Sequence, residues 1–220
     1  MLRFEIQIKT PSRAETIDLP RRPVVFESRP LRVLDFDIEN RPLTYLGSDF
    51  TTAEVTAIAW AWVDQPEAVT VYLLGETELP VILTAFCAAY AQADLVTGHF
   101  ILGHDLPMVS GALMELGLPP LSDKLVHDTK VHLVRSKGIS KSQESLGAML
   151  NLSSPKVSMN QAKWRAANRL TPEGLRDVRE RVVGDVRQHI EMRARLLERG
   201  YLSPPKLWRS GSARVEEYHP

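Results

Sequence analysis

The sequence contains a single cysteine, Cys87, so no disulfide can form within the chain. This residue lies in the apolar run at residues 81–89, where a buried and unreactive thiol is the ordinary interpretation. No uncharged apolar run is long enough to cross a bilayer, and charges interrupt residues 1–9, where a signal peptide needs an apolar segment. These shortages predict a soluble, cytoplasmic protein of a reducing compartment, with no membrane partner.

The formal net charge is zero, because 27 Lys and Arg residues balance 27 Asp and Glu residues. The charges are nevertheless distributed unevenly along the chain. Residues 31–120 carry two basic and twelve acidic residues, whereas residues 121–170 carry nine basic and three acidic residues. An acidic part joined to a basic part fits a metal site beside a surface for a polyanion, and it also fits helices with solvated basic faces.

The length and the apolar content predict one main domain. A chain of 220 residues with 44% apolar residues can bury a sizeable core. Several prolines divide residues 1–30 into short extended pieces, so we expect an accessory arm there. The main domain is predicted at residues 31–200, and an extended or mobile tail, latched through Leu207 and Trp208, at residues 201–220.

The periodicity of apolar residues predicts the elements of this domain. Strands are expected at residues 2–9, 31–40, 54–63, 68–74 and 94–97, with a hairpin turn at Gln65 and Pro66. Helices are expected at residues 78–93, 104–116, 122–136, 142–150 and 159–169, and from Thr171 to near Gly200. Strands followed by helices predict an α/β fold with a mixed sheet flanked by helices and a mainly helical C-terminal half.

The predicted strand at residues 31–40 ends in acid. Side chains alternate across a strand, so its apolar residues share one face and its acids the other: Leu34, Phe36 and Ile38 against Asp35, Asp37 and Glu39. Carboxylates that share one face repel each other unless a cation lies between them, and a divalent ion with oxygen ligands satisfies that need. The alternative is a strand that runs into a solvated acidic loop.

Two further acids, Asp105 and Asp185, lie on predicted helices, one at a helix start and one within an apolar stripe. Asp105 falls in the first turn of a predicted helix, where the helix dipole favours a carboxylate, so simple capping is one interpretation. Asp185 belongs to the apolar stripe of the last helix and must meet a cation if it is buried. That cation is either a metal ion or Arg181, one turn earlier. His189, on the same stripe, is interpreted as a core histidine with satisfied hydrogen bonds.

Three segments resemble the exonuclease motifs of the DEDD 3′ to 5′ exonuclease superfamily, the ribonuclease-H-like group that includes proofreading exonuclease domains of DNA polymerases. They read Leu-Asp-Phe-Asp-Ile-Glu at 34–39, Gly-His-Phe-Ile-Leu-Gly-His-Asp-Leu-Pro at 98–107 and Arg-Val-Val-Gly-Asp-Val at 181–186, in the expected order. The resemblance spans about residues 31–198 and implies a ribonuclease-H-like fold. It also implies that the catalytic residues and metal ligands are Asp37, Glu39, Asp105 and Asp185.

The function that this resemblance implies is metal-dependent 3′ to 5′ hydrolysis of nucleic acid, with DNA preferred. A single strand or a 3′ end would be the partner, and two Mg²⁺ or Mn²⁺ ions bridged by Asp37 would be the cofactors; a replication or repair partner stays open. Candidates for substrate contact are four apolar side chains, for which ordinary core packing is the alternative, and two lysines: Phe36, Ile38, Phe100, Leu102, Lys156 and Lys163.

The sequence departs from the family pattern in the third motif, where a Tyr four residues or a His five residues before the acid orients the attacking water. Those places hold Arg181 and Glu180. Arginine stays protonated and cannot act as a base, although it can stabilise phosphate charge. His104, His189 and Glu180 are the other candidates for orienting the water. The alternatives are a catalytically weakened or inactive nucleic-acid-binding protein, a structure-specific endonuclease, and a protein whose acids only cap and bridge.

Overall fold

The computed structural model describes residues 29–43, 50–153 and 157–211, and the described residues from Leu31 onwards belong to one compact unit. The strand predicted at residues 2–9 and nearly all of the accessory arm lie outside the described residues, so the domain boundaries stay predictions. Within the described ranges, no helix combines the length and the apolar character that a bilayer crossing requires.

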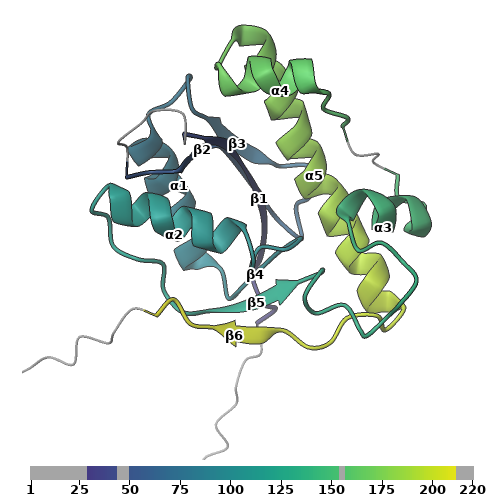
Figure 1. The fold of residues 1–220 in the computed structure, drawn as a ribbon. Coiled ribbons are helices and arrows are strands. Elements are labelled where there is room, and N and C mark those ends of the chain that lie inside the picture. The colour runs from purple at the N-terminus through teal and green to yellow at the C-terminus, as the bar shows by residue number, and fades with distance from the viewer. Residues whose placement is uncertain (1–28, 44–49, 154–156, 212–220) are drawn as a thin grey trace, which may run out of the picture. The chain divides into compact units, whose positions relative to one another are not determined.

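The described residues form a six-stranded sheet in the order β3-β2-β1-β4-β5-β6 (Figure 1). The strands are β1 (Val33–Pro42), β2 (Ala53–Trp62), β3 (Thr70–Leu73), β4 (Leu95–Gly98), β5 (Lys124–Asp128) and β6 (Lys206–Trp208). Strand β1 pairs antiparallel with β2 and parallel with β4, β2 and β3 form the predicted antiparallel hairpin, and β5 runs parallel to β4 and antiparallel to β6. The prediction of an α/β fold with a mixed sheet is confirmed.

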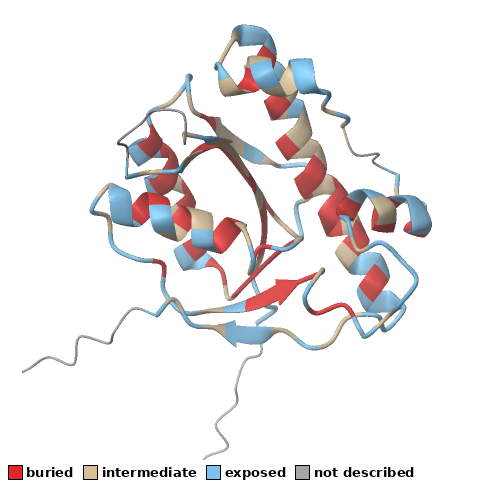
Figure 2. Cartoon of the chain, in the orientation of Figure 1, coloured by how far each residue is buried: buried red, intermediate tan, exposed pale blue. Residues whose placement is uncertain are grey.

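Helices cover both faces of this sheet (Figure 1). They are α1 (Leu79–Gln92), α2 (Asp105–Glu115), α3 (Gln143–Leu150), α4 (Gln161–Asn168) and α5 (Pro172–Glu198). Helices α1 and α2 pack on one face, where Leu34, Phe36 and Ile38 of β1 join the larger core cluster. Helix α5 packs on the other face, and buried residues follow the central strands and one side of this helix (Figure 2). The acids of β1 therefore face α5.

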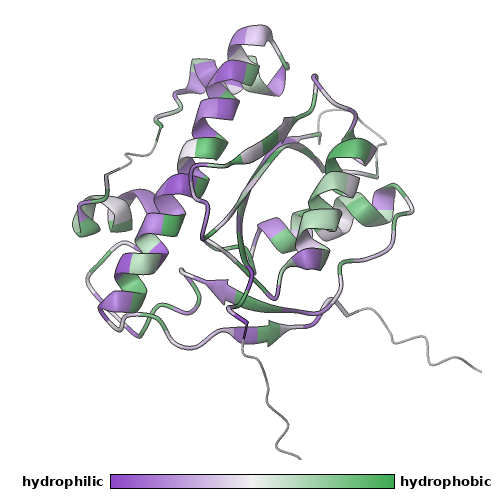
Figure 3. Ribbon diagram, turned by 180° about the vertical axis from the view of Figure 1, so that it is seen from behind, coloured by the Kyte–Doolittle hydropathy of each residue, from purple (hydrophilic) through white to green (hydrophobic). Residues whose placement is uncertain are grey.

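The alanines of β2 explain how α5 reaches the strand that carries the acids. Ala57, Ala59 and Ala61 lie in one buried cluster with Val178 and Val182 of α5. Small side chains on the sheet let a helix pack close to the backbone of the strands. In Figure 3, α1 is mostly green whereas α5 alternates between purple and green, as expected for a helix with one face on the sheet and one in solvent. The short β2 side chains thus bring polar groups of α5 within reach of β1.

Local signals predicted α5 correctly. The hydroxyl of Thr171 accepts a hydrogen bond from the backbone N–H of Gly174 at 3.2 Å, and Pro172 occupies the first turn. The predicted apolar stripe, with its acid and its histidine, is buried throughout: Val178, Val182, Asp185, His189, Met192 and Leu196.

The helix predicted at residues 122–136 is wrong, because Lys124–Asp128 forms strand β5 instead. This segment pairs with β4 and β6, and Val126, His127 and Asp128 are all buried. A short strand with neighbours on both sides shows no clean alternation, and its ladder outweighs the local helical signal. The tail segment Lys206–Trp208 adds the edge strand β6.

A glycine at the start of α5 sets the approach of α4. A Cβ atom on Gly174 would lie 2.3 Å from backbone atoms of Ala166 and Ala167. Gly174→Ala is therefore expected to lower the free energy of unfolding by about 1–3 kcal/mol, because the two helices must separate. Urea unfolding measures this change. Gly111→Ala is the matched control, since a Cβ there would meet nothing within 4 Å, and an exposed helical alanine should stabilise by roughly 0.5–1 kcal/mol.

Candidate metal centre

Three of the four predicted metal ligands come together between β1 and α5. Carboxylate oxygens of Asp37, Glu39 and Asp185 all lie within 4.8 Å of one another, and we call these residues the three-carboxylate cluster. Asp185 is buried, whereas Asp37 and Glu39 are half-buried. Oxygen ligands at this spacing suit a hard divalent ion such as Mg²⁺ or Mn²⁺. The residues present therefore fit a metal ion.

Asp105, the fourth predicted ligand, lies beside this cluster and is not part of it. Its Oδ1 accepts the backbone N–H of Ile38 at 3.1 Å, so it contacts β1 between Asp37 and Glu39. Its Oδ2 lies 3.4 Å from Nδ1 of His104. The carboxylate thus sits at the first turn of α2, where the helix dipole favours it, but its oxygens contact β1 and the His104 ring and not the amides of its own helix.

Arg181 lies among the acids. Its Nε donates to Oε1 of Glu39 at 3.0 Å, and its Nη2 lies 3.5 Å from Oδ2 of Asp185. On the side away from the acids, its Nη1 donates to the backbone carbonyl of Val157 at 2.7 Å. Sequence analysis offered Arg181 as the alternative partner of Asp185. This ion pair forms, and Arg181 forms a second one with Glu39.

His104, another candidate for orienting the water, contacts Asp105 and Asn40. One ring nitrogen is 3.4 Å from Asp105 and the other is 3.1 Å from Oδ1 of Asn40. The hydrogen bond to Asp105 raises the pKa of His104, while partial burial opposes the rise. Asn40 follows an irregularity in the β1–β2 register directly after Glu39, and such bulges often re-aim side chains at functional sites. Glu180, by contrast, is exposed on α5.

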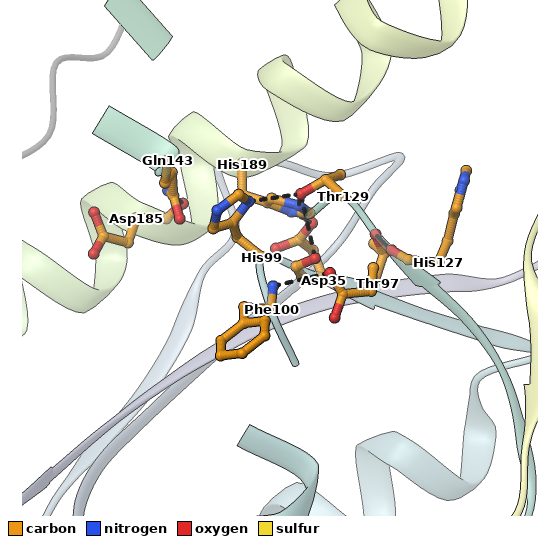
Figure 4. Close-up of polar contacts among 11 residues, drawn as sticks. Asp35, Thr97, His99, Phe100, His127, Thr129, Gln143, Asp185 and His189 are labelled. Carbon is orange, nitrogen blue, oxygen red and sulfur yellow. Dashed lines mark hydrogen bonds and ion pairs between the residues drawn. The ribbon is translucent and has the colours of Figure 1, made fainter. Parts of the chain in front are cut away.

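His189 is a core histidine, as interpreted from the sequence. Its Nδ1 lies 2.5 Å from Oδ2 of Asp35, and its Nε2 lies 2.9 Å from Oγ1 of Thr129 (Figure 4). Thr129 Oγ1 is also 2.9 Å from Nδ1 of His99, whose Nε2 is 2.9 Å from the carbonyl of Lys141. Both ring nitrogens of His189 are thus engaged within the core, so this residue is not placed to orient an attacking water.

The proton positions in this series of hydrogen bonds follow from the contact between His99 and the Lys141 carbonyl. Burial lowers the pKa of His99 to about 4, so its ring is neutral at neutral pH. The Lys141 carbonyl can only accept, so His99 donates from Nε2 and accepts at Nδ1 from the Thr129 hydroxyl. With its proton given to His99, Thr129 accepts from Nε2 of His189.

Burial raises the pKa of Asp35, and His189 opposes that rise. The contact between Oδ2 of Asp35 and Nδ1 of His189 joins two almost completely buried groups, one on β1 and one on α5.

Sequence reasoning gave Asp128 no role, yet this residue holds the loop that leads to Asp105. Its Oδ1 accepts from the backbone N–H groups of Phe100, Lys130 and Val131, and its Oδ2 from that of Leu102, at 2.9–3.0 Å. Sequence analysis had no signal for this role, because it predicted a helix at residues 122–136 and therefore placed Asp128 inside that helix. Phe100 takes a positive φ of 70° within this loop, a conformation that the Asp128 contacts support.

The residues predicted to contact a substrate divide into two groups. Phe36 and Ile38 are 1% and 3% exposed within the core cluster, so the core interpretation applies and they are not placed to stack on a base. Phe100 is 38% exposed, and Nζ of Lys130 lies 3.8 Å from its ring centroid. Leu102 is partly buried against the core.

Of the two lysines that were predicted to contact the substrate, only Lys163 lies within the described residues. Nζ of Lys163 forms an ion pair with Asp177 at 2.8 Å, and Lys156 lies outside the described residues.

A cavity of about 290 Å³ adjoins Arg181 between α3, α4 and α5. Its lining is Ser142, Gln143, Glu144, Val157, Ser158, Met159, Trp164 and Arg181.

Comparisons with known proteins concern the fold. No protein-family model matches the sequence, and no curated protein matches it. The structure is similar to that of a family B DNA polymerase from the hyperthermophilic archaeon Pyrobaculum calidifontis, with a TM-score of 0.58 and 19% sequence identity. The similarity covers 77% of this chain and 25% of the polymerase, so the chain spans about a quarter of that protein's length. The described sheet and helices are consistent with a ribonuclease-H-like fold.

Proposed function

We propose that the protein is a metal-dependent 3′ to 5′ exonuclease that hydrolyses phosphodiester bonds of nucleic acid, with DNA as the preferred substrate. The observation that carries this proposal is the convergence of Asp37, Glu39 and Asp185 from two segments about 150 residues apart. One structure with a similar fold is that of a family B DNA polymerase. Proofreading exonuclease domains of DNA polymerases belong to the superfamily that the three sequence motifs resemble.

The residues around the cluster have separate roles in this proposal. The three-carboxylate cluster would hold the metal, which when bound lowers the pKa of a water ligand and offsets charge on the phosphate. His104, whose ring nitrogens contact Asn40 and Asp105, would exchange its contact with Asn40 for the attacking water and orient it from the α2 side. Arg181 cannot act as a base, and its N–H groups would instead contact phosphate oxygens.

The cavity beside Arg181 is the proposed site for the terminal nucleotide. Its lining combines the indole of Trp164 with the guanidinium of Arg181, whose Cζ is 5.6 Å from the indole centroid. A base can stack on an aromatic ring whatever its identity, and an arginine can hold the adjoining phosphate. This pairing would bind any nucleotide, as an exonuclease of broad sequence tolerance requires.

The test is a cleavage assay on 5′-labelled single-stranded DNA and RNA with Mg²⁺ or Mn²⁺. We expect a ladder that shortens from the 3′ end, stops when the metal is chelated, and is absent when the 3′ end is blocked. A circular single strand should stay intact. Cleavage of the circle would instead identify an endonuclease.

A non-enzymatic nucleic-acid-binding protein of the same fold is the second candidate. Arg181 favours it, because this residue replaces the Tyr of the family pattern and also contacts two of the three clustered acids. This candidate predicts DNA binding in a gel-shift experiment without a ladder under any metal condition. The same assay therefore distinguishes the two functions.

A further inference from the structure

We propose that Arg181 occupies the position of the second cation in this site, so that the three-carboxylate cluster binds a single divalent ion and not a pair. The inference rests on the nuclease function proposed above, and it concerns a residue in which this chain departs from the family pattern. Arg181 contacts Glu39 and Asp185, whose carboxylates come from opposite sides of the cluster, β1 and α5.

The guanidinium is fixed in this place. The Val157 carbonyl accepts a hydrogen bond from Nη1 of Arg181 at 2.7 Å. The Cζ atom of Arg181 also lies over the indole of Trp164, 5.6 Å from the ring centroid. The side chain is 16% exposed, so little of it can move into solvent without breaking these contacts. An arginine held by partners on both sides acts as a built-in cation, unlike a surface arginine that pairs transiently.

Arg181 competes with a second ion for the same oxygens. The three-carboxylate cluster carries three negative charges, and Arg181 places one permanent positive charge against two of its members, Glu39 and Asp185. A second divalent ion on these carboxylates would lie beside the fixed guanidinium, and like charges in a partly buried site repel strongly. Once the guanidinium is removed, the oxygens that it contacts can ligate a second ion.

The proposal predicts how many ions the protein binds. In a titration of the full chain with Mn²⁺, followed by the electron paramagnetic resonance signal of free Mn²⁺, we expect saturation at a single ion. Arg181→Gln removes the fixed charge while keeping a polar side chain, and it should bind a second ion. Arg179→Gln is the matched control on the same helix. Its exposed ion pair with Glu76 lies away from the cluster, so its binding should equal that of the unmodified chain.

Thermal unfolding gives a second readout. Without metal, Arg181→Gln should unfold at a lower temperature than the unmodified chain, because Glu39 and Asp185 lose their shared cation. Mn²⁺ should raise its unfolding temperature by more than it raises that of the unmodified chain. If circular dichroism shows that Arg181→Gln does not fold, Arg181→Met replaces it. Methionine keeps an unbranched apolar side chain and lacks the charge, so a second ion is expected again, and a single ion would overturn the inference.

The outcomes separate this inference from the proposed function. Two ions on the unmodified chain, or an unchanged single ion on Arg181→Gln, would overturn the role of Arg181 and leave the nuclease proposal standing. No bound ion, together with no cleavage in the labelled-DNA assay, would overturn both. A single ion that becomes a pair in Arg181→Gln supports the inference even if the cleavage assay detects no ladder.

Discussion

Asp37→Asn is expected to reduce metal-dependent hydrolysis by about 10³-fold or more, since several kcal/mol of transition-state stabilisation depend on the metal and each 1.36 kcal/mol is a factor of ten. Asp37 belongs to the three-carboxylate cluster that is proposed to hold the metal. Asparagine has nearly the same shape but no charge, so it weakens the metal site with little change in packing. Initial rates on 5′-labelled DNA measure the effect.

Stability measurements distinguish loss of the metal site in Asp37→Asn from loss of the folded structure. Removing one of three neighbouring carboxylates relieves their repulsion, so Asp37→Asn should unfold without metal at the same temperature as the unmodified chain, or a higher one. Mn²⁺ should raise its unfolding temperature much less. Asp64→Asn, at an exposed turn between β2 and β3, is the matched control and should change neither property. Full activity in Asp37→Asn would exclude the three-carboxylate cluster as the catalytic site.

His189→Leu is expected to lower the free energy of unfolding by about 3–5 kcal/mol, the cost of leaving a buried charge-bearing group without its partner. Asp35 and His189 are both almost completely buried and contact each other at 2.5 Å, so loss of the imidazole removes this hydrogen-bond partner of the Asp35 carboxyl and leaves Arg193 as its nearby cation. Thr129 loses its contact with His189 Nε2 at the same time. Urea unfolding of the purified protein measures the change.

A double variant tests whether the two residues act as a pair. Asp35→Leu combined with His189→Leu replaces both polar groups by apolar ones, and such replacements are often close to neutral. We therefore expect the double variant to lose clearly less stability than the sum of the two single variants. Additive losses would show that the Asp35–His189 contact contributes no coupling energy. If the proposed function holds, cleavage of labelled DNA should also fall in His189→Leu, because the pair joins β1 to α5 near Asp185.

The elements that sequence analysis predicted well are those with local signals. Thr171 and Pro172 mark the start of α5 through chemistry within one helical turn, and its stripe repeats at three and four residues. The alternation in β1 separated Phe36, in the core, from Asp35 and Glu39, which face α5. Both patterns act over a few residues, so they can be interpreted without knowing what packs against them.

The errors and omissions concern contacts between distant segments. Strand β5 was predicted as a helix because its preference is set by pairing with β4 and β6, which the local sequence does not contain. The support that Asp128 gives to the Phe100 loop likewise depends on two strand ends meeting at one edge of the sheet. Neither contact leaves a pattern within a short window of sequence.

The sequence alone determined the fold class, the order of the acids and the absence of a Tyr or His at the usual place in the third motif. Only the tertiary structure decided which of those acids meet, because α5 approaches β1 across the alanines of β2. It also showed that Arg181 lies between Glu39 and Asp185, whereas the sequence offered the Asp185 pair only as an alternative. The physical reason is that periodicity specifies which face a side chain occupies, while the distances between charges depend on how whole elements pack.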